Sequence, residues 1–211
     1  MGNYGIHGRW THLYINGLYW GIYHVHERPD ADFMNAYFGE KELFYDAINS
    51  SSAANGSIAA YNKMVTISSN LVSSPQEYEN LKKHLHIESF IDYMLLNFYI
   101  GNRDWDGHNW RAAGNGPSGE PFRFFPWDSE FALSPNNSGA IQSPNPISNA
   151  LLTDVTNKNG NQRPTGIHQK LKNNNWYRLK FADHIRKHLF NGGPLSPEGA
   201  KTIWKKRSDS L

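Results

Sequence analysis

The chain has 211 residues, which is long enough for one sizeable domain with its own core. Because 21 Lys and Arg residues nearly balance 19 Asp and Glu residues, the net charge of +2 argues against nucleic acid as the main partner. The lack of cysteine excludes disulfides and thiolate metal sites, and no apolar run approaches the roughly 20 residues that a membrane-spanning helix needs.

Residues 10–26 predict a β-hairpin. They are rich in aromatic and β-branched residues, which favour strands. The dipeptide Asn16-Gly17 divides them into two runs, and both residue types accept the positive φ angles of a tight two-residue turn. Because Pro29 cannot continue a strand ladder, the second strand is expected to end before it. Asp30 or Asp32 is a candidate N-cap for a short helix that runs through Phe38.

The middle of the chain predicts one loop and two helices. Residues 46–72 are rich in Ser, Asn and Ala with little periodicity, which indicates a loop or insertion. Ser74 begins a capping box with proline at the first helical position. Residues 87–100 predict a mostly buried helix that ends at Gly101. Its apolar stripe consists of Ile87, Phe90, Ile91, Met94, Leu95 and Phe98.

The second half of the chain predicts a polar loop, a short strand and a helical tail. The loop covers residues 102–109, and the aromatic strand covers residues 121–126. Residues 134–164 are rich in Asn, Ser, Pro and Gly, so we expect an extended or mobile surface segment. Three further helices are expected at 166–171, at 176–190 and from 196 onward.

One ordered set of polar residues is a candidate catalytic and metal-binding site. In protein kinases, a loop Asp accepts the substrate hydroxyl proton, and an Asn five residues later binds Mg²⁺. A second Asp then binds Mg²⁺ next to the phosphates. Asp104 and Asn109 have that spacing, and Asp128 follows after enough residues for a strand, a turn and a strand. An Asp with an Asn five positions later is common by chance, so the order of helix, loop, strand and Asp is the more specific signal.

Three segments resemble the family of spore-coat protein H (CotH) kinases. Residues 21–30 read GIYHVHERPD and resemble its Gly-x-Tyr…Glu-Arg-x-Asp segment. Residues 90–97 and 101–105, FIDYMLLN and GNRDW, look like its catalytic-loop block. Residues 122–131, FRFFPWDSEF, resemble its metal-binding block. The resemblance covers nearly the whole chain and implies an α+β, atypical protein-kinase-like fold.

The resemblance also implies an activity and roles for particular residues. The expected reaction transfers the γ-phosphate of ATP to serine in a protein, with Mg²⁺, or Mn²⁺ in its place, as the metal. Asp104 matches the catalytic Asp, and Asn109 and Asp128 match the two metal ligands. The chain and its acceptor protein are both expected outside the cell or on the cell or spore surface.

The same resemblance divides the chain into two lobes. Residues 1–30 are expected to be a partial N-lobe that retains its last strands as an antiparallel hairpin, and residues 31–211 a mostly helical C-lobe. Glu27, Arg28 and Asp30 would lie in the hinge that meets adenine through backbone groups.

The resemblance also implies that the chain is cut short at both ends. From the residues alone, it is either a cytosolic protein or an excised piece of a longer exported chain. The phosphate-covering loop, the phosphate-binding Lys and its Glu partner are expected upstream of Met1, unless Lys41 or Lys63 replaces that Lys. The N-terminus shows no signal-peptide pattern.

Other interpretations of the same residues remain open. Asp104 and Asp106 are typical turn-capping residues, and Asp106 competes with Asp104 for the functional role. The spacing of Asn102, Asp104 and Asp106 matches the first half of an EF-hand loop, but Ala113 stands where a bidentate Glu is required. Glu130 is either a second metal ligand beside Asp128 or a charged residue on the surface.

Two non-kinase functions also remain open. One is a non-catalytic surface or coat assembly module on a kinase-like scaffold. The other is a carbohydrate-associated module built on exposed aromatic residues, although the Trp residues are expected mostly in the core.

Overall fold

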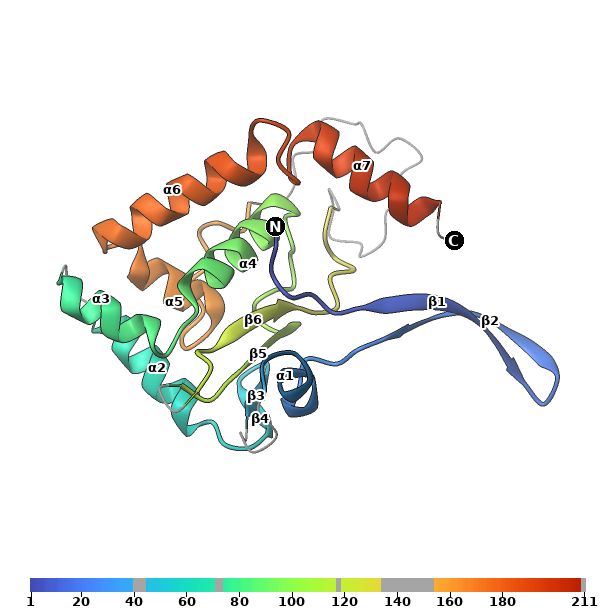
Figure 1. Ribbon diagram of the computed structural model, residues 1–211, viewed down its shortest axis with the longest axis horizontal. Helices are drawn as coiled ribbons and strands as arrows, with labels where there is room; N and C mark the ends of the chain where they lie inside the picture. The colour runs from blue at the N-terminus through green and yellow to red at the C-terminus, as the bar shows by residue number, and fades with distance from the viewer. Residues whose placement is uncertain (40–44, 71–73, 117–118, 134–153, 210–211) are drawn as a thin grey trace.

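The computed structural model describes residues 1–39, 45–70, 74–116, 119–133 and 154–209 (Figure 1). Within these ranges the chain has an α+β fold of seven helices and two antiparallel sheets. A two-stranded hairpin extends away from a body in which helices surround a four-stranded sheet (Figure 1). The fold class is therefore α+β, as predicted, whereas the division into two kinase lobes stays a prediction.

The predicted hairpin is present as β1 (Gly8–Ile15) and β2 (Leu18–His26). Its turn residues Asn16 and Gly17 have φ angles of 51° and 78°, as the sequence requires. Most of its large apolar side chains are exposed, because the hairpin extends away from the body and both of its faces meet solvent.

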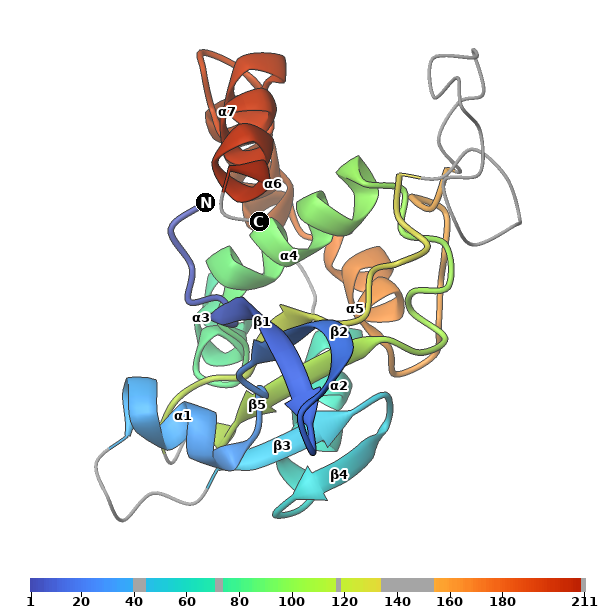
Figure 2. The ribbon, with the colours of Figure 1, turned by 90° about the vertical axis from the view of Figure 1, so that its right-hand side faces the viewer.

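The four-stranded sheet has the strand order β4-β3-β5-β6. The strands are β3 (Asp46–Asn49), β4 (Ser52–Asn55), β5 (Trp110–Gly114) and β6 (Arg123–Pro126). Successive side chains of a strand point to opposite faces, so Phe125 packs in a small core with α1 (Ala31–Phe38). Phe124 packs in the larger core with α4 (Ile87–Tyr99). Figure 2 shows α1 and α4 on opposite sides of the sheet.

Local sequence signals set the helix ends. Asp30 caps α1 by accepting a hydrogen bond from Phe33 N at 3.1 Å. Ser74 caps α3 by accepting one from Glu77 N. The apolar stripe of α4 is buried as predicted, apart from half-buried Phe98. The other helices are α2 (Ala59–Ser69), α3 (Pro75–Lys82), α5 (Pro164–Leu171), α6 (Asn175–Leu189) and α7 (Pro197–Ser208).

The prediction of a loop over residues 46–72 is wrong for most of that range, which forms β3, β4 and α2. Ile48 is buried in the sheet, and α2 buries Tyr61, Met64 and Ser68 at helical spacing. The serine-rich composition hides this pattern. Ser68 is compatible with a helix interior here because its hydroxyl donates to the Met64 carbonyl at 2.8 Å.

The expectation that the Trp residues lie in the core is only partly right. Trp105 and Trp110 are fully buried, whereas Trp10 and Trp20 on the hairpin are 50% and 58% exposed. The surface segment predicted at 134–164 falls largely on residues 134–153, outside the described part of the chain. None of the described helices is long and apolar enough to cross a membrane.

A buried histidine in α5 makes stability depend on pH. His168 Nδ1 forms a hydrogen bond with the Tyr177 hydroxyl at 2.8 Å. Burial lowers the pKa of His168 to about 4, and the charge of Lys172 adds a smaller effect in the same direction. The unfolded state therefore binds a proton between pH 6.5 and 4 that the folded state does not. The stability that neutral His168 provides is present above pH 6.5 and is lost as the pH falls towards 4.

Because of this shift in the pKa of His168, the free energy of unfolding is expected to fall by on the order of 3 kcal/mol between pH 7 and pH 4, at 1.36 kcal/mol per pKa unit. Urea unfolding at several pH values measures it. His168→Gln keeps a polar partner for Tyr177 but cannot titrate, so the variant should lose less stability over this range. Equal slopes in the two proteins would show that His168 does not carry the effect.

Candidate active site

The loop that follows α4 is anchored in the core by Trp105. Its ring is fully buried, and its Nε1 donates to the Tyr93 hydroxyl at 2.5 Å. At the start of the loop, the Asn102 side chain donates to Asn97 Oδ1 at 3.0 Å, and Gly101 turns the chain with a φ of 57°. Because these contacts fix both sides of Asp104, the position of its carboxylate is set by the fold.

Asp104 and Asn109 are in direct contact. Asn109 Nδ2 donates to Asp104 Oδ2, which leaves the amide oxygen of Asn109 unused in that bond. Asn109 has a φ of 59°, a left-handed conformation that asparagine adopts more readily than most residues. Asp104 Oδ1 is buried and has no hydrogen-bond partner among the residues that the structure describes. A buried carboxylate oxygen without a partner is costly unless a ligand completes it.

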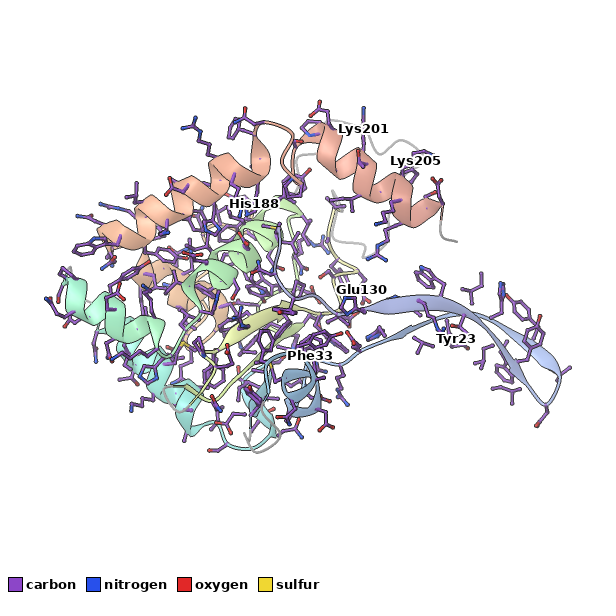
Figure 3. All side chains as sticks on the ribbon, viewed as in Figure 1. Tyr23, Phe33, Glu130, His188, Lys201 and Lys205 are labelled. Atoms are coloured by element: carbon purple, nitrogen blue, oxygen red, sulfur yellow. The ribbon has the colours of Figure 1, made fainter. Side chains whose placement is uncertain are left out.

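Asp128 and Glu130 lie after β6, next to the same loop. A side-chain hydrogen bond and the charge of Asp128 raise the pKa of Glu130, and the charge of Asp104 adds to the rise. Asn102 Nδ2 donates to Ser129 Oγ at 3.4 Å, which joins the loop to this segment. Figure 3 shows Glu130 near the base of the hairpin. The structure therefore gathers three carboxylates and Asn109 in one region.

Trp127 places Asp128 at the edge of a pocket. The Arg111 guanidinium lies 4.1 Å from the centre of the Trp127 ring, a cation–π contact that fixes the residue before Asp128. The pocket has a volume of about 390 Å³. Its lining residues are Ile6, His24, His26, Pro126, Trp127 and Asp128. It therefore lies between the base of the hairpin and the end of β6.

The predicted hinge residues are mostly occupied by structural contacts. Glu27 accepts hydrogen bonds from the Tyr37 hydroxyl at 2.6 Å and from His7 N at 2.8 Å. Both bonds lower the pKa of Glu27, and the bond from Tyr37 has the larger effect. Asp30 caps α1, and Arg28 is exposed. The backbone N–H and C=O of Glu27, the C=O of Arg28 and the N–H of Asp30 already have partners. Few backbone groups of this segment are free for adenine.

Asp106 has a structural role in this loop. Its Oδ2 accepts from both N and Oγ1 of Thr165, at 2.8 and 2.7 Å, and so completes the N-terminus of α5. The EF-hand interpretation also fails, because Ala113 lies in β5 and pairs there with Ala47 and Arg123. Asp104 is therefore the better placed of the two carboxylates to act on a ligand.

Lys158 was not singled out from the sequence. Its ammonium donates to the backbone carbonyls of Arg103 and Trp105, on both sides of Asp104. Burial lowers its pKa, while the charges of Asp106 and Asp104 oppose that shift. Lys158 thus holds the loop in place and balances its negative charge. It lies 54 positions along the chain from Asp104, in an Asn-rich stretch that gave no signal of a site.

The fold and the site together define an α+β domain compatible with the protein-kinase-like class. A buried helix leads into a loop with Asp104 and Asn109, and a β-hairpin then leads to Asp128. A family model described as CotH kinase protein matches residues 1–198. The chain therefore belongs to the CotH kinase family, as the sequence motifs indicated. Among curated proteins, no sequence matches this chain.

Proposed function

We propose that this chain binds ATP together with Mg²⁺ and transfers the γ-phosphate to a serine hydroxyl of a protein. Membership of the CotH kinase family supports a kinase-like function. The observation that carries the finer proposal is the gathering of Asp104, Asn109, Asp128 and Glu130 in one region, with one oxygen of Asp104 buried and unpaired. The acceptor serine is proposed to lie on an extracellular, cell-surface or spore-surface protein.

Each side chain has a separate part in the proposed reaction. Asn109 Oδ1 and the Asp128 carboxylate are hard oxygen ligands of the kind that Mg²⁺ or Mn²⁺ accepts alongside phosphate oxygens. Asp104 Oδ1 orients the serine hydroxyl and takes its proton. The serine oxygen then bonds to the γ-phosphorus as the bond from that phosphorus to the ADP oxygen breaks. Catalysis rests on positioning and charge neutralisation.

The raised pKa of Glu130 supports a cation at this place. The carboxylate of Glu130 lies beside that of Asp128, with Asp104 nearby, and these like charges repel one another. A divalent cation bound between these carboxylates removes that repulsion. The pocket beside Asp128 lies next to this group, where a bound triphosphate would meet the metal.

Thermal unfolding in the presence of nucleotides tests the proposal. A non-hydrolysable ATP analogue with Mg²⁺ should stabilise the chain by about 2.7 kcal/mol at one hundred times its Kd, a rise of several degrees in Tm. The analogue with a chelator, Mg²⁺ alone, and AMP with Mg²⁺ are the controls and should give little or no shift. An unchanged Tm at millimolar Mg²⁺ and analogue would overturn the proposal.

The exposed aromatic side chains of the hairpin favour a second candidate function, carbohydrate binding. Trp10, Trp20 and Tyr23 are all about half exposed, and Figure 3 shows Tyr23 on the hairpin outside the body. Exposed aromatic rings are the side chains that stack on sugars. The same thermal assay distinguishes the two functions, since a shift with a soluble polysaccharide and none with the nucleotide would favour this candidate.

A further inference from the structure

A buried polar cluster joins α4 to α6. Asp92 lies in α4, and His184 and His188 lie one turn apart on the same face of α6. Asp92 Oδ1 is 2.6 Å from His184 Nδ1 and 2.8 Å from His188 Nε2. One ligand atom from each of the three residues lies within 4.8 Å of the others. Figure 3 shows His188 on the side of α6 that faces α4.

This cluster is separate from the candidate active site. Asp92 precedes the end of α4 by two turns, which is roughly 10 Å of helix axis, and the loop with Asp104 begins beyond that end. The active-site region offers carboxylate and amide oxygens. The cluster at Asp92 offers two imidazole nitrogens and one carboxylate oxygen.

Hydrogen bonds do not satisfy His188. Its side chain is 1% exposed, and neither ring nitrogen makes a well-aligned hydrogen bond with any residue in the described ranges. Its Nε2 is close to Asp92 Oδ1 but is not oriented to donate to it. A buried polar atom without a partner costs on the order of 1–3 kcal/mol. A ligand between the three side chains would remove that cost.

The charge states of the cluster suit a cation. Burial lowers the pKa of His188, the charges of Lys187 and His184 add to this effect, and Asp92 opposes it. Burial alone would raise the pKa of Asp92, but the hydrogen bonds from His184 and Asn3 and the positive charges of the histidines when protonated lower it overall. An ionised carboxylate and a neutral imidazole are the states in which these groups bind metals.

The surroundings of Asp92 orient its carboxylate towards the two histidines. Asn3 Nδ2 donates to Asp92 Oδ2 at 2.6 Å, which holds the second carboxylate oxygen and leaves Oδ1 facing the histidines. Such outer contacts are typical around metal-binding carboxylates. A pocket of about 270 Å³, lined in part by Asn3, Ser89 and Asp92, adjoins the cluster. Of the three side chains of the cluster, Asp92 lines this pocket.

We propose that Asp92, His184 and His188 bind one divalent transition-metal ion of the Zn²⁺ type, which ties α4 to α6. Two imidazoles and one carboxylate are a common Zn²⁺ ligand set, whereas Mg²⁺ takes oxygen ligands. With bonds near 2.0–2.1 Å, tetrahedral ligand atoms lie about 3.3 Å apart, so small side-chain rotations from the present contacts suffice. A water molecule from the pocket completes the coordination.

Metal binding by the untagged, chelator-treated protein tests this proposal. Titration with Zn²⁺ alone should show one site with micromolar or tighter Kd and a higher Tm. Co²⁺ at the same site should give the visible absorption of a tetrahedral complex. His188→Gln and Asp92→Asn should each weaken Zn²⁺ binding at least 100-fold. His12→Gln, which changes an exposed hairpin histidine, is the matched control and should bind like the wild type.

Two results would overturn the proposal. One is a wild-type protein that binds no Zn²⁺, which would leave only an Asp–His ion pair. The other is Zn²⁺ binding that persists unchanged in folded His188→Gln, which would place the ion elsewhere. If the variants fail to fold, the wild-type stoichiometry and the Co²⁺ spectrum decide, since an octahedral spectrum or a non-integral stoichiometry contradicts this site. Nucleotide plays no part in any of these readouts.

Discussion

Asp128→Asn is expected to weaken binding of Mg²⁺ with an ATP analogue at least 100-fold. The substitution removes the negative charge that faces the metal but keeps the size of the side chain. Asp128 has a φ of 49°, and asparagine accepts this left-handed backbone, whereas alanine would strain it. The variant should therefore fold normally and lose only the metal–triphosphate interaction. Isothermal titration calorimetry measures the loss.

The matched control for this variant is Asp183→Asn. Asp183 is exposed on α6, and the same change in charge and size there should leave nucleotide affinity within about twofold. Binding of the analogue without Mg²⁺ should be weak and equal in all three proteins. If Asp128→Asn binds the Mg²⁺ complex as tightly as the wild type does, Asp128 is not a metal ligand.

Asp104→Asn is expected to separate turnover from binding. The asparagine can still accept the hydrogen bond from Asn109 through its amide oxygen, so the loop should keep its structure. It cannot take a proton from serine, and loss of a general base typically lowers kcat by about 10²- to 10⁴-fold. Transfer of labelled γ-phosphate to a serine-rich model protein such as casein measures kcat, and calorimetry should show an unchanged Kd for the Mg²⁺–nucleotide complex.

Asp106→Asn tests the neighbouring carboxylate. Asp106 Oδ2 accepts two hydrogen bonds from Thr165, so its change should cost about 1–2 kcal/mol of stability and spare the turnover of folded protein. The assignment is reversed if Asp106→Asn loses turnover while Asp104→Asn keeps it. A wild-type chain that transfers no label in the presence of Mg²⁺ or Mn²⁺ would contradict the proposed activity for this chain.

Local signals made much of the fold predictable. The hairpin followed from Asn16-Gly17, because few residue pairs accept two positive φ angles in succession. The buried helix α4 followed from its apolar stripe, and the capped helices followed from Ser74 and Asp30. In each case the residues that fix the structure lie within a few positions of one another, so the sequence order alone displays them.

Features that depend on distant partners were not predictable. β3 is a strand because it pairs with β5, more than 60 residues later, although its own composition is typical of a loop. Trp20 and Trp105 are both tryptophan, yet the fold leaves Trp20 exposed on the hairpin and buries Trp105 in the core. The four-residue spacing of His184 and His188 was visible, but Asp92 joins them only through the packing of α4 on α6.

The candidate active site could be predicted from the sequence only in part. The motifs named Asp104, Asn109 and Asp128 by their order and spacing. The structure adds the contact between Asn109 and Asp104, the raised pKa of Glu130 beside Asp128 and the support from Lys158, each of which needs three-dimensional coordinates. The hinge prediction for Glu27 rests on the family resemblance and stays a prediction, and the bonds that its side chain accepts from Tyr37 and His7 depend on partners that the motif does not contain.

A crystal structure of the chain with Mn²⁺ and a non-hydrolysable ATP analogue tests the central claim most directly, because Mn²⁺ is located by its anomalous scattering. The expected result is an ion about 2.1 Å from oxygens of Asp128, Asn109 and the phosphates, with Asp104 facing the γ-phosphate. An ion bound only at Asp92, His184 and His188, or a triphosphate outside the pocket beside Asp128, would contradict the claim.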